Sequence, residues 1–174
     1  MIQTWKNIVL DFRQPVSYLI PATIIALVVF CLLIVWTKKR LRLSWVLFLI
    51  YAEVLLQTAY FSREQGTRTG IDLDLFGTWG HTATAHAYFI ENIMMFIPFG
   101  ILMPIAFKKM RKGRWCVLAG FLCSCGIELS QLLTSRGYCQ LDDVVTNTVG
   151  ALIGWGVWRV CKNLFNRLQE ETGD

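Results

Sequence analysis

Charged residues are scarce in this sequence, and their scarcity argues against a soluble protein. Asp, Glu, Lys and Arg make up 17% of the 174 residues, whereas a soluble domain carries about 25%. Hydrophobic residues make up 55%, and the mean hydropathy is +0.47. The net charge of +5 does not indicate nucleic-acid binding, because the basic residues form short runs between apolar segments. The composition therefore predicts one domain, residues 1–174, that lies in a membrane.

The sequence also lacks the familiar motifs of enzymes and metal sites. It has no H-E-x-x-H motif, no glycine-rich phosphate loop and no Ser-His-Asp order. Its two histidines, His81 and His86, are five apart, which does not match a helix face with two metal ligands. The six cysteines contain no C-x-x-C pair. We therefore predict no metal site from these residues, and no cleavable signal peptide, since no small-residue cleavage motif follows the first apolar run.

Apolar segments dominate the rest of the chain, and about 20 such residues cross a membrane as a helix. The expected spans are Val16–Trp36, Leu43–Phe61, Ala87–Phe107, Trp115–Thr134 and Val144–Trp158. The last is short, and spans only if it includes Asp143 and Arg159 to Cys161; a re-entrant segment is the alternative. Polar loops are expected at Ser62–His86 and Ser135–Asp142.

These segments predict an all-α fold, a polytopic bundle of about five transmembrane helices. Residues 1–15 are a candidate interfacial segment, and residues 162–174 a candidate cytoplasmic tail. Twelve of the seventeen lysines and arginines fall in the loops and terminus of one side: Lys38, Lys39, Arg40, Arg42, Lys108, Lys109, Arg111, Lys112, Arg114, Arg159, Lys162 and Arg167. The positive-inside rule then predicts an N-terminus outside and a C-terminus inside.

Carboxylates inside these spans lie toward the predicted outer face. At a rise of about 1.5 Å per residue, Glu91 lies roughly 6 Å, Glu128 roughly 9 Å and Glu53 roughly 12 Å from that face. The outer half of the hydrocarbon is about 15 Å thick. The inner halves of the spans contain almost nothing polar, which favours an outward-facing pocket over a channel with polar groups at all depths.

Helical spacing brings several of these polar residues onto shared faces. Glu53 and Gln57 share one face, while Gly150 and Gly154 form a G-x-x-x-G pair that lets another helix approach closely. The candidate pocket residues are Glu91, Asn92, Glu128, Gln131, Arg136, Asp142, Asp143 and Asn147. Arg136 is the expected counter-charge to the carboxylates and a candidate ligand for a lipid phosphate. Interhelical hydrogen bonding without chemistry is the expected role for any one of Glu53, Gln57 or Ser130.

Three ordered motifs in the last three segments carry a family resemblance. They are ENIMMFIPFGILMP at Glu91–Pro104, and E-x-x-Q, R, D-x-x-x-N and G-x-x-x-G within Gly126–Gly154. They resemble the VanZ-like family, while the first two spans resemble it only in hydropathy. The resemblance implies a bacterial inner-membrane protein, and the namesake is associated with low-level resistance to teicoplanin, a lipoglycopeptide. It implies no settled biochemical activity.

Two functions remain open from the sequence. A binding or shielding protein would hold membrane lipids, a lipid-linked cell-wall precursor or the acyl tail of a lipoglycopeptide, through Asn92, Gln131, Arg136, Asp142 and Asn147. A membrane-embedded enzyme would use Glu91, Glu128 and Asp143 as catalytic acid and base groups on a lipid or lipid-linked cell-wall substrate. Asp142 and Asp143 are also candidates to hold a divalent cation that binds a phosphate. No other cofactor is predicted.

Overall fold

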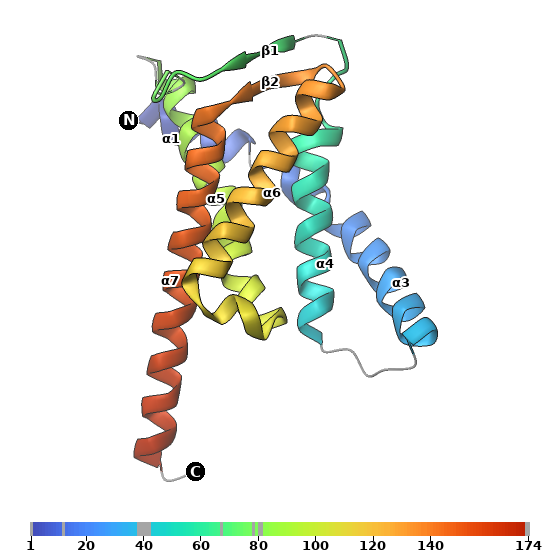
Figure 1. Cartoon of the computed structure of the whole chain (residues 1–174), viewed down its shortest axis with the longest axis vertical. Coiled ribbons are helices and arrows are strands. Elements are labelled where there is room, and N and C mark those ends of the chain that lie inside the picture. The colour runs from blue at the N-terminus through green and yellow to red at the C-terminus, as the bar shows by residue number, and fades with distance from the viewer. Residues whose placement is uncertain are drawn as a thin grey trace.

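The computed structural model of the chain describes residues 2–11, 13–37, 43–66, 68–77, 79 and 82–172. The basic run at residues 38–42, which supports the orientation argument, and His81 lie outside the described residues. The fold is an all-α bundle, as predicted (Figure 1). Its helices are α1 (Ile2–Asp11), α2 (Arg13–Ser17), α3 (Leu19–Thr37), α4 (Leu43–Leu56), α5 (Ala83–Ala106), α6 (Gly113–Leu133) and α7 (Leu141–Thr172).

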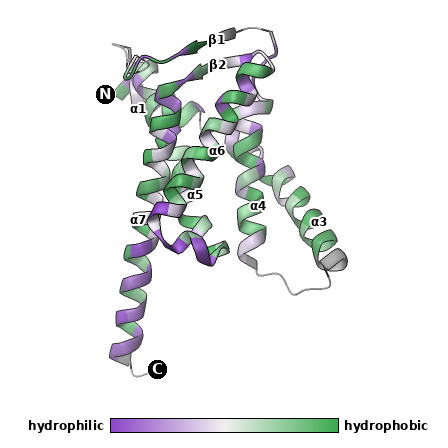
Figure 2. Cartoon of the chain, viewed as in Figure 1, coloured by the Kyte–Doolittle hydropathy of each residue, from purple (hydrophilic) through white to green (hydrophobic). Residues whose placement is uncertain are grey.

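Four stretches of the described chain are long and apolar enough to cross a membrane. They are Ile2–Leu33, Ser44–Phe61, Ala83–Ala106 and Gly113–Leu133. α7 is longer, but its first turns carry Asp142, Asp143, Thr146 and Asn147, which lower its hydropathy. Figure 2 shows that the C-terminal half of α7 is hydrophilic and projects beyond the hydrophobic part of the bundle. The protein is therefore a membrane protein with several apolar helices.

Two boundaries differ from the sequence predictions. α5 begins at Ala83 rather than Ala87, because the Thr82 side chain caps the helix by accepting a bond from the Ala85 backbone N–H at 3.1 Å. The helix therefore starts before the apolar run does. α7 continues unbroken from Leu141 to Thr172, so the re-entrant alternative for its apolar part is wrong. No proline interrupts that stretch, and Gly150 and Gly154 are packed against α5.

The two predicted polar loops each contain a short strand. β1 (Arg68–Asp72) and β2 (Arg136–Gln140) pair in parallel, with Arg68 opposite Arg136 and Asp72 opposite Gln140. A further bond, from the Gly66 backbone N–H to the Ser135 carbonyl at 2.7 Å, joins the two loops just before the strands. Figure 1 shows both strands crossing the end of the bundle where α6 ends and α7 begins. They form a cap over that end.

α4 ends in a π-helical turn, η1 (Gln57–Phe61), directly before the first of these loops. A π turn leaves a backbone carbonyl without its usual α-helical partner. In this turn, the Ala59 carbonyl accepts a hydrogen bond from Gln131 Nε2 of α6 at 2.7 Å. The end of α4 is thereby joined to the end of α6.

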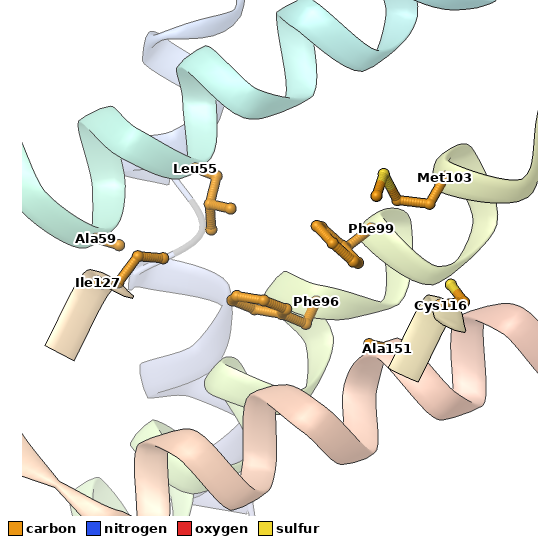
Figure 3. Packing of buried hydrophobic residues seen from close by; sticks show 8 residues of the cluster. All are labelled: Leu55, Ala59, Phe96, Phe99, Met103, Cys116, Ile127 and Ala151. Atoms are coloured by element: carbon orange, nitrogen blue, oxygen red, sulfur yellow. The ribbon is translucent and has the colours of Figure 1, made fainter. Parts of the chain in front are cut away.

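The apolar core lies between α4, α5, α6 and α7 (Figure 3). It contains Leu55, Ala59, Phe96, Phe99, Met103, Cys116, Ile127 and Ala151. Phe96 and Phe99 come from the F-x-P-F-G motif of α5, and their ring centroids are 5.6 Å apart. This motif therefore supplies the centre of the core.

α5 and α7 approach each other closely because glycines line their contact. A Cβ at Gly150 would collide with the Ile93 carbonyl oxygen, and one at Gly154 with the Ile97 carbonyl oxygen. A Cβ at Gly100 of α5 would collide with the Ala151 carbonyl oxygen of α7. The predicted role of the G-x-x-x-G pair is confirmed, and this contact sets the position of the polar residues one turn away.

Candidate functional site

The centre of the candidate site is a pair of buried carboxylates on α6 and α7. Glu128 is 2% exposed and Asp143 is 8% exposed. Glu128 Oε2 accepts a bond from the Gln140 backbone N–H at 2.9 Å, and Asp143 Oδ1 accepts one from Asn92 Nδ2 of α5 at 2.6 Å. The two carboxylates are also close enough to repel each other. Residues from three helices and β2 therefore meet at this pair.

Local structure explains why Asp143 is tolerated there. It lies in the first turn of α7, where the helix dipole stabilises a negative charge. The last residue of β2, Gln140, lies directly before this helix, so its backbone N–H reaches Glu128. The junction of β2 and α7 thus supplies both a carboxylate and a donor to the site.

Two buried amide side chains lie on the same helix faces as these carboxylates. Asn147 is 2% exposed, and its Nδ2 donates to the Ser124 hydroxyl at 2.9 Å. Gln131 is 1% exposed, and its Nε2 donates to the Ala59 carbonyl. In each amide the oxygen is buried without a hydrogen-bond partner. Since unpaired buried acceptors are costly, these oxygens mark places where a donor is missing.

Asp142 has a different role from its neighbour Asp143. It is 2% exposed, and its Oδ1 accepts a bond from the Phe76 backbone N–H at 2.6 Å. Phe76 has a φ of 64°, which is unfavourable for a residue with a large side chain. Asp142 therefore holds the loop after β1 in a strained conformation against the start of α7.

The cation near the carboxylate pair is Arg63, which the sequence analysis did not select. Arg63 attracts both Glu128 and Asp143 electrostatically. A Cβ at Gly137 would lie 2.9 Å from Arg63 Nη1 and 3.1 Å from Gln131 Oε1, so the glycine leaves room for both groups. The prediction that Arg136 is the counter-charge is corrected accordingly.

Arg136 instead lies at the start of β2, beside the end of α4. Its Nη1 donates to the Arg63 carbonyl at 2.6 Å, and its guanidinium lies 5.2 Å from the centre of the Tyr60 ring. A side chain held by a backbone carbonyl and an aromatic ring keeps other N–H donors for a further partner.

Glu91 contacts a different part of the molecule from its neighbour Asn92. Its carboxyl group lies close enough to Asp11 of α1 for the two acidic groups to interact, and its Oε1 is buried without a hydrogen-bond partner. α1 is further tied to α5 by a 3.3 Å bond between Asn7 and Thr84. The structure therefore brings Asn92, Glu128 and Asp143 together. Gln131, Asp142 and Asn147 are buried nearby in the chain but bond with other groups, and Glu91 and Arg136 also have other partners.

Glu53 makes its hydrogen bond within its own helix and not with the carboxylate pair. Its Oε1 accepts a 3.0 Å bond from Gln57 Nε2 one turn along α4. The predicted shared face of Glu53 and Gln57 is confirmed.

A hollow of about 300 Å³ lies beside the site and is lined by Phe76, Trp79 and Phe89. A second hollow, of about 530 Å³, lies on α1 among Ile2, Trp5, Lys6, Val9 and Leu10. Neither is lined by Glu128 or Asp143, so a common pocket around the predicted residues stays a prediction. In the described part of the chain, no group of three His, Cys, Asp or Glu side chains is arranged to hold a metal ion. The divalent cation also stays a prediction.

Sequence reasoning missed Arg63, Tyr60 and Phe76 as members of this end of the molecule. All three lie in or next to segments that read as loop or apolar helix, with no motif of their own. The one available signal was proximity in the predicted topology, because the loop before α5 and the loop before α7 lie on the same side of the membrane.

Comparison with known proteins agrees with the motifs that meet at this site. The VanZ/LLP1 family matches residues 23–162. Protein VanZ of Enterococcus faecium is 30% identical over 86 residues, which cover 45% of this chain and 48% of that protein. The aligned part thus spans about half the length of that relative. No solved structure matches the chain. Because the family match covers most of the sequence and includes every residue of the carboxylate pair and its partners, the chain belongs to the VanZ/LLP1 family.

Proposed function

We propose that this protein acts at the outer face of the bacterial cytoplasmic membrane, where it binds or shields an envelope lipid or a lipid-linked cell-wall intermediate. In doing so it lowers the susceptibility of the cell to lipoglycopeptides such as teicoplanin. The observation that carries the proposal is the buried polar cluster around Glu128 and Asp143, at one end of an apolar bundle. An amphiphile can place its head group at that end while its tail stays in the lipid.

The orientation is part of the proposal. Basic residues gather at the opposite end of the chain's helices, on η2 (Lys108–Arg111) and in the C-terminal half of α7, at Arg159, Lys162 and Arg167. By the positive-inside rule that end faces the cytoplasm. The strand cap and the carboxylate pair then face outward, where cell-wall intermediates are used.

Exposed side chains near the cap support access from the membrane interface. Trp79 is 42% exposed and Phe76 is 63% exposed, and aromatic residues favour the interface between lipid and water. Their hollow adjoins Asp142 through the bond to the Phe76 backbone. A head group that entered between these rings would reach the start of α7.

Drug susceptibility tests the proposal. Cells that express the protein should be protected more against teicoplanin, which carries an acyl tail, than against vancomycin, which carries none. Glu128→Gln or Asp143→Asn should reduce this difference at least severalfold at equal protein level, because each removes a buried charge while keeping the side-chain volume. Glu170→Gln changes an exposed carboxylate on the last turns of α7 and is the matched control. Equal protection against both drugs, or full protection with both cluster variants, would contradict the proposal.

An enzymatic function is the second candidate, because Glu128 and Asp143 form a buried pair of interacting carboxylates. Such pairs carry acid and base roles in many hydrolases and transferases. Incubation of the purified protein with a labelled lipid-linked cell-wall precursor separates the two functions. A new product that Glu128→Gln abolishes indicates an enzyme, whereas bound but unchanged precursor indicates a binding protein.

A further inference from the structure

We propose that Arg63 and Arg136 form a phosphate-binding site that takes the terminal phosphate or diphosphate of a prenyl-type lipid. This inference rests on the proposed function in one respect, namely that the ligand is an amphiphile held at the cap end of the bundle. It adds the chemical class of the head group and the residues that bind it. The site is separate from the carboxylate pair, although Arg63 also attracts both carboxylates electrostatically.

The two arginines are neighbours in space, although 73 residues separate them in the chain. Arg136 Nη1 donates to the Arg63 backbone carbonyl at 2.6 Å, so the two residues are held together by a direct bond. Both are half-buried at the end of α4 and the start of β2. Half-buried charges are screened less by water and salt than exposed ones, which strengthens their attraction for an anion.

Acceptors for these donors are missing among the described residues. The Arg63 guanidinium makes no hydrogen bond and no ion pair with any described side chain, and Arg136 makes a single bond, to a carbonyl. Glu128 and Asp143 attract Arg63 from a distance longer than an ion pair. A guanidinium has five N–H donors in a planar fork that matches phosphate oxygens. The pair therefore presents several donors without acceptors.

A glycine lies next to Arg63 in this site, and an aromatic ring lies next to Arg136. Gly137 leaves the space that Arg63 Nη1 occupies, since a Cβ there would lie 2.9 Å from that nitrogen. The Tyr60 ring, 5.2 Å from the Arg136 guanidinium, fixes that side chain by a cation–π contact. Arg136 is thus held in place before a ligand arrives, which lowers the entropy that binding costs.

The charge of the site favours a phosphate monoester or a diphosphate over a phosphodiester. A phosphate monoester carries a charge of about −1.5 to −2 at pH 7, which matches two guanidinium groups. The phosphodiester of a common bilayer lipid carries a single charge and has no terminal oxygens free for a second fork. Lipid-linked cell-wall intermediates of the diphosphate type fit this chemistry.

Calorimetric titration of the purified full chain in detergent tests the site with geranyl diphosphate, geranyl monophosphate and inorganic diphosphate as probes. We expect saturable binding of geranyl diphosphate, and affinity at least about tenfold weaker in Arg63→Ala and in Arg136→Ala, because each loses charged hydrogen bonds. Arg136→Lys keeps the charge but not the fork and should fall between. Arg167→Ala, on the exposed end of α7, is the control and should bind like the parent.

Each outcome bears on the proposal. Inorganic diphosphate that binds as tightly as geranyl diphosphate supports the phosphate site and assigns it to a free anion rather than a lipid. Displacement of geranyl diphosphate by phosphatidylglycerol vesicles, absence of binding, or equal binding by the parent and both alanine variants would overturn it. Melting temperatures and the Arg136→Lys variant separate a lost site from a lost fold. The measurement needs no antibiotic, so a failure of the proposed resistance function would leave its result intact.

Discussion

The close contact between α5 and α7 predicts that adding a single methyl group at its glycines destabilises the protein. Gly154→Ala places a Cβ against the Ile97 carbonyl oxygen, and Gly150→Ala places one against the Ile93 carbonyl oxygen. These obstacles are backbone atoms, which cannot rotate away as a side chain can. Relief therefore requires the two helices to move apart along their closest contact.

The size of the expected loss of stability depends on which atom the new Cβ meets. Extra methylenes in a packed core cost about 1–3 kcal/mol, and a backbone obstacle should bring the cost to about 3 kcal/mol. At roughly 2–4 °C per kcal/mol for a chain of this size, each variant should melt about 6–12 °C lower. The Asn92–Asp143 bond, which joins the same two helices at 2.6 Å, should weaken as they separate.

Gly156→Ala is the matched control on the same helix, because a Cβ at Gly156 meets nothing within 4 Å. Alanine has the higher helix propensity by about 1 kcal/mol, so this variant should melt at or slightly above the parent. Thermal unfolding of the detergent-purified proteins, followed by size-exclusion chromatography after heating, provides the comparison. Melting of Gly154→Ala within about 1 °C of Gly156→Ala would refute the close packing of α5 on α7.

Two further predictions concern topology and thiol chemistry at the cap. On a cysteine-free background, an impermeant maleimide added to intact cells should label a cysteine placed at Asp74 and spare one placed at Glu170; the reverse pattern would contradict the orientation. With Cys139 as the single cysteine, burial and then the Glu128 carboxylate raise the pKa of the thiol, so less reactive thiolate is present at pH 8. Alkylation should therefore be slower than at an exposed cysteine and should accelerate as the pH rises. Glu128→Gln removes one cause of the raised pKa and should increase the rate at pH 8, whereas an unchanged rate would place Glu128 away from Cys139 or show it uncharged.

The membrane spans were accessible to prediction because they depend on the solvent. Runs of apolar residues must lie in lipid as helices, since a helix satisfies its backbone hydrogen bonds internally. The expected spans Leu43–Phe61 and Trp115–Thr134 accordingly match α4 with η1 and α6 to within two residues. The start of α5 was misplaced because a single capping threonine, rather than hydropathy, begins that helix.

The strand cap was not predictable in the same way. β1 and β2 are five residues each and lie in polar segments without alternating hydrophobic residues. Their pairing joins two loops that are 68 residues apart at the Arg68–Arg136 register, and no local pattern encodes it. The cap forms because the helices on either side bring the two loops to the same end of the bundle.

Several members of the candidate site were identified from the sequence, because charge inside an apolar span is informative by itself. Glu128, Asp143, Asn92 and Asn147 stood out as costly groups at helical spacing, and all four bond with another helix or with β2 directly through their side chains. The spacing of residues within each helix does not show which polar groups face each other between helices. Glu91 and Asn92 are adjacent in sequence, yet one contacts α1 and the other contacts α7.

By itself, the sequence determined that this chain is a helical membrane protein with polar groups toward one face, because hydropathy and basic-residue placement depend on the membrane and not on the fold. Only the tertiary structure decided which cation serves the carboxylates. Arg63 and Arg136 both lie in polar segments at the same end, so composition does not distinguish them. The packing of η1 against α6, together with the space left by Gly137, brings Arg63 to Glu128 and Asp143 and leaves Arg136 on the Tyr60 ring. Electrostatic partners depend on distance, and distance between segments far apart in the chain is set by packing alone.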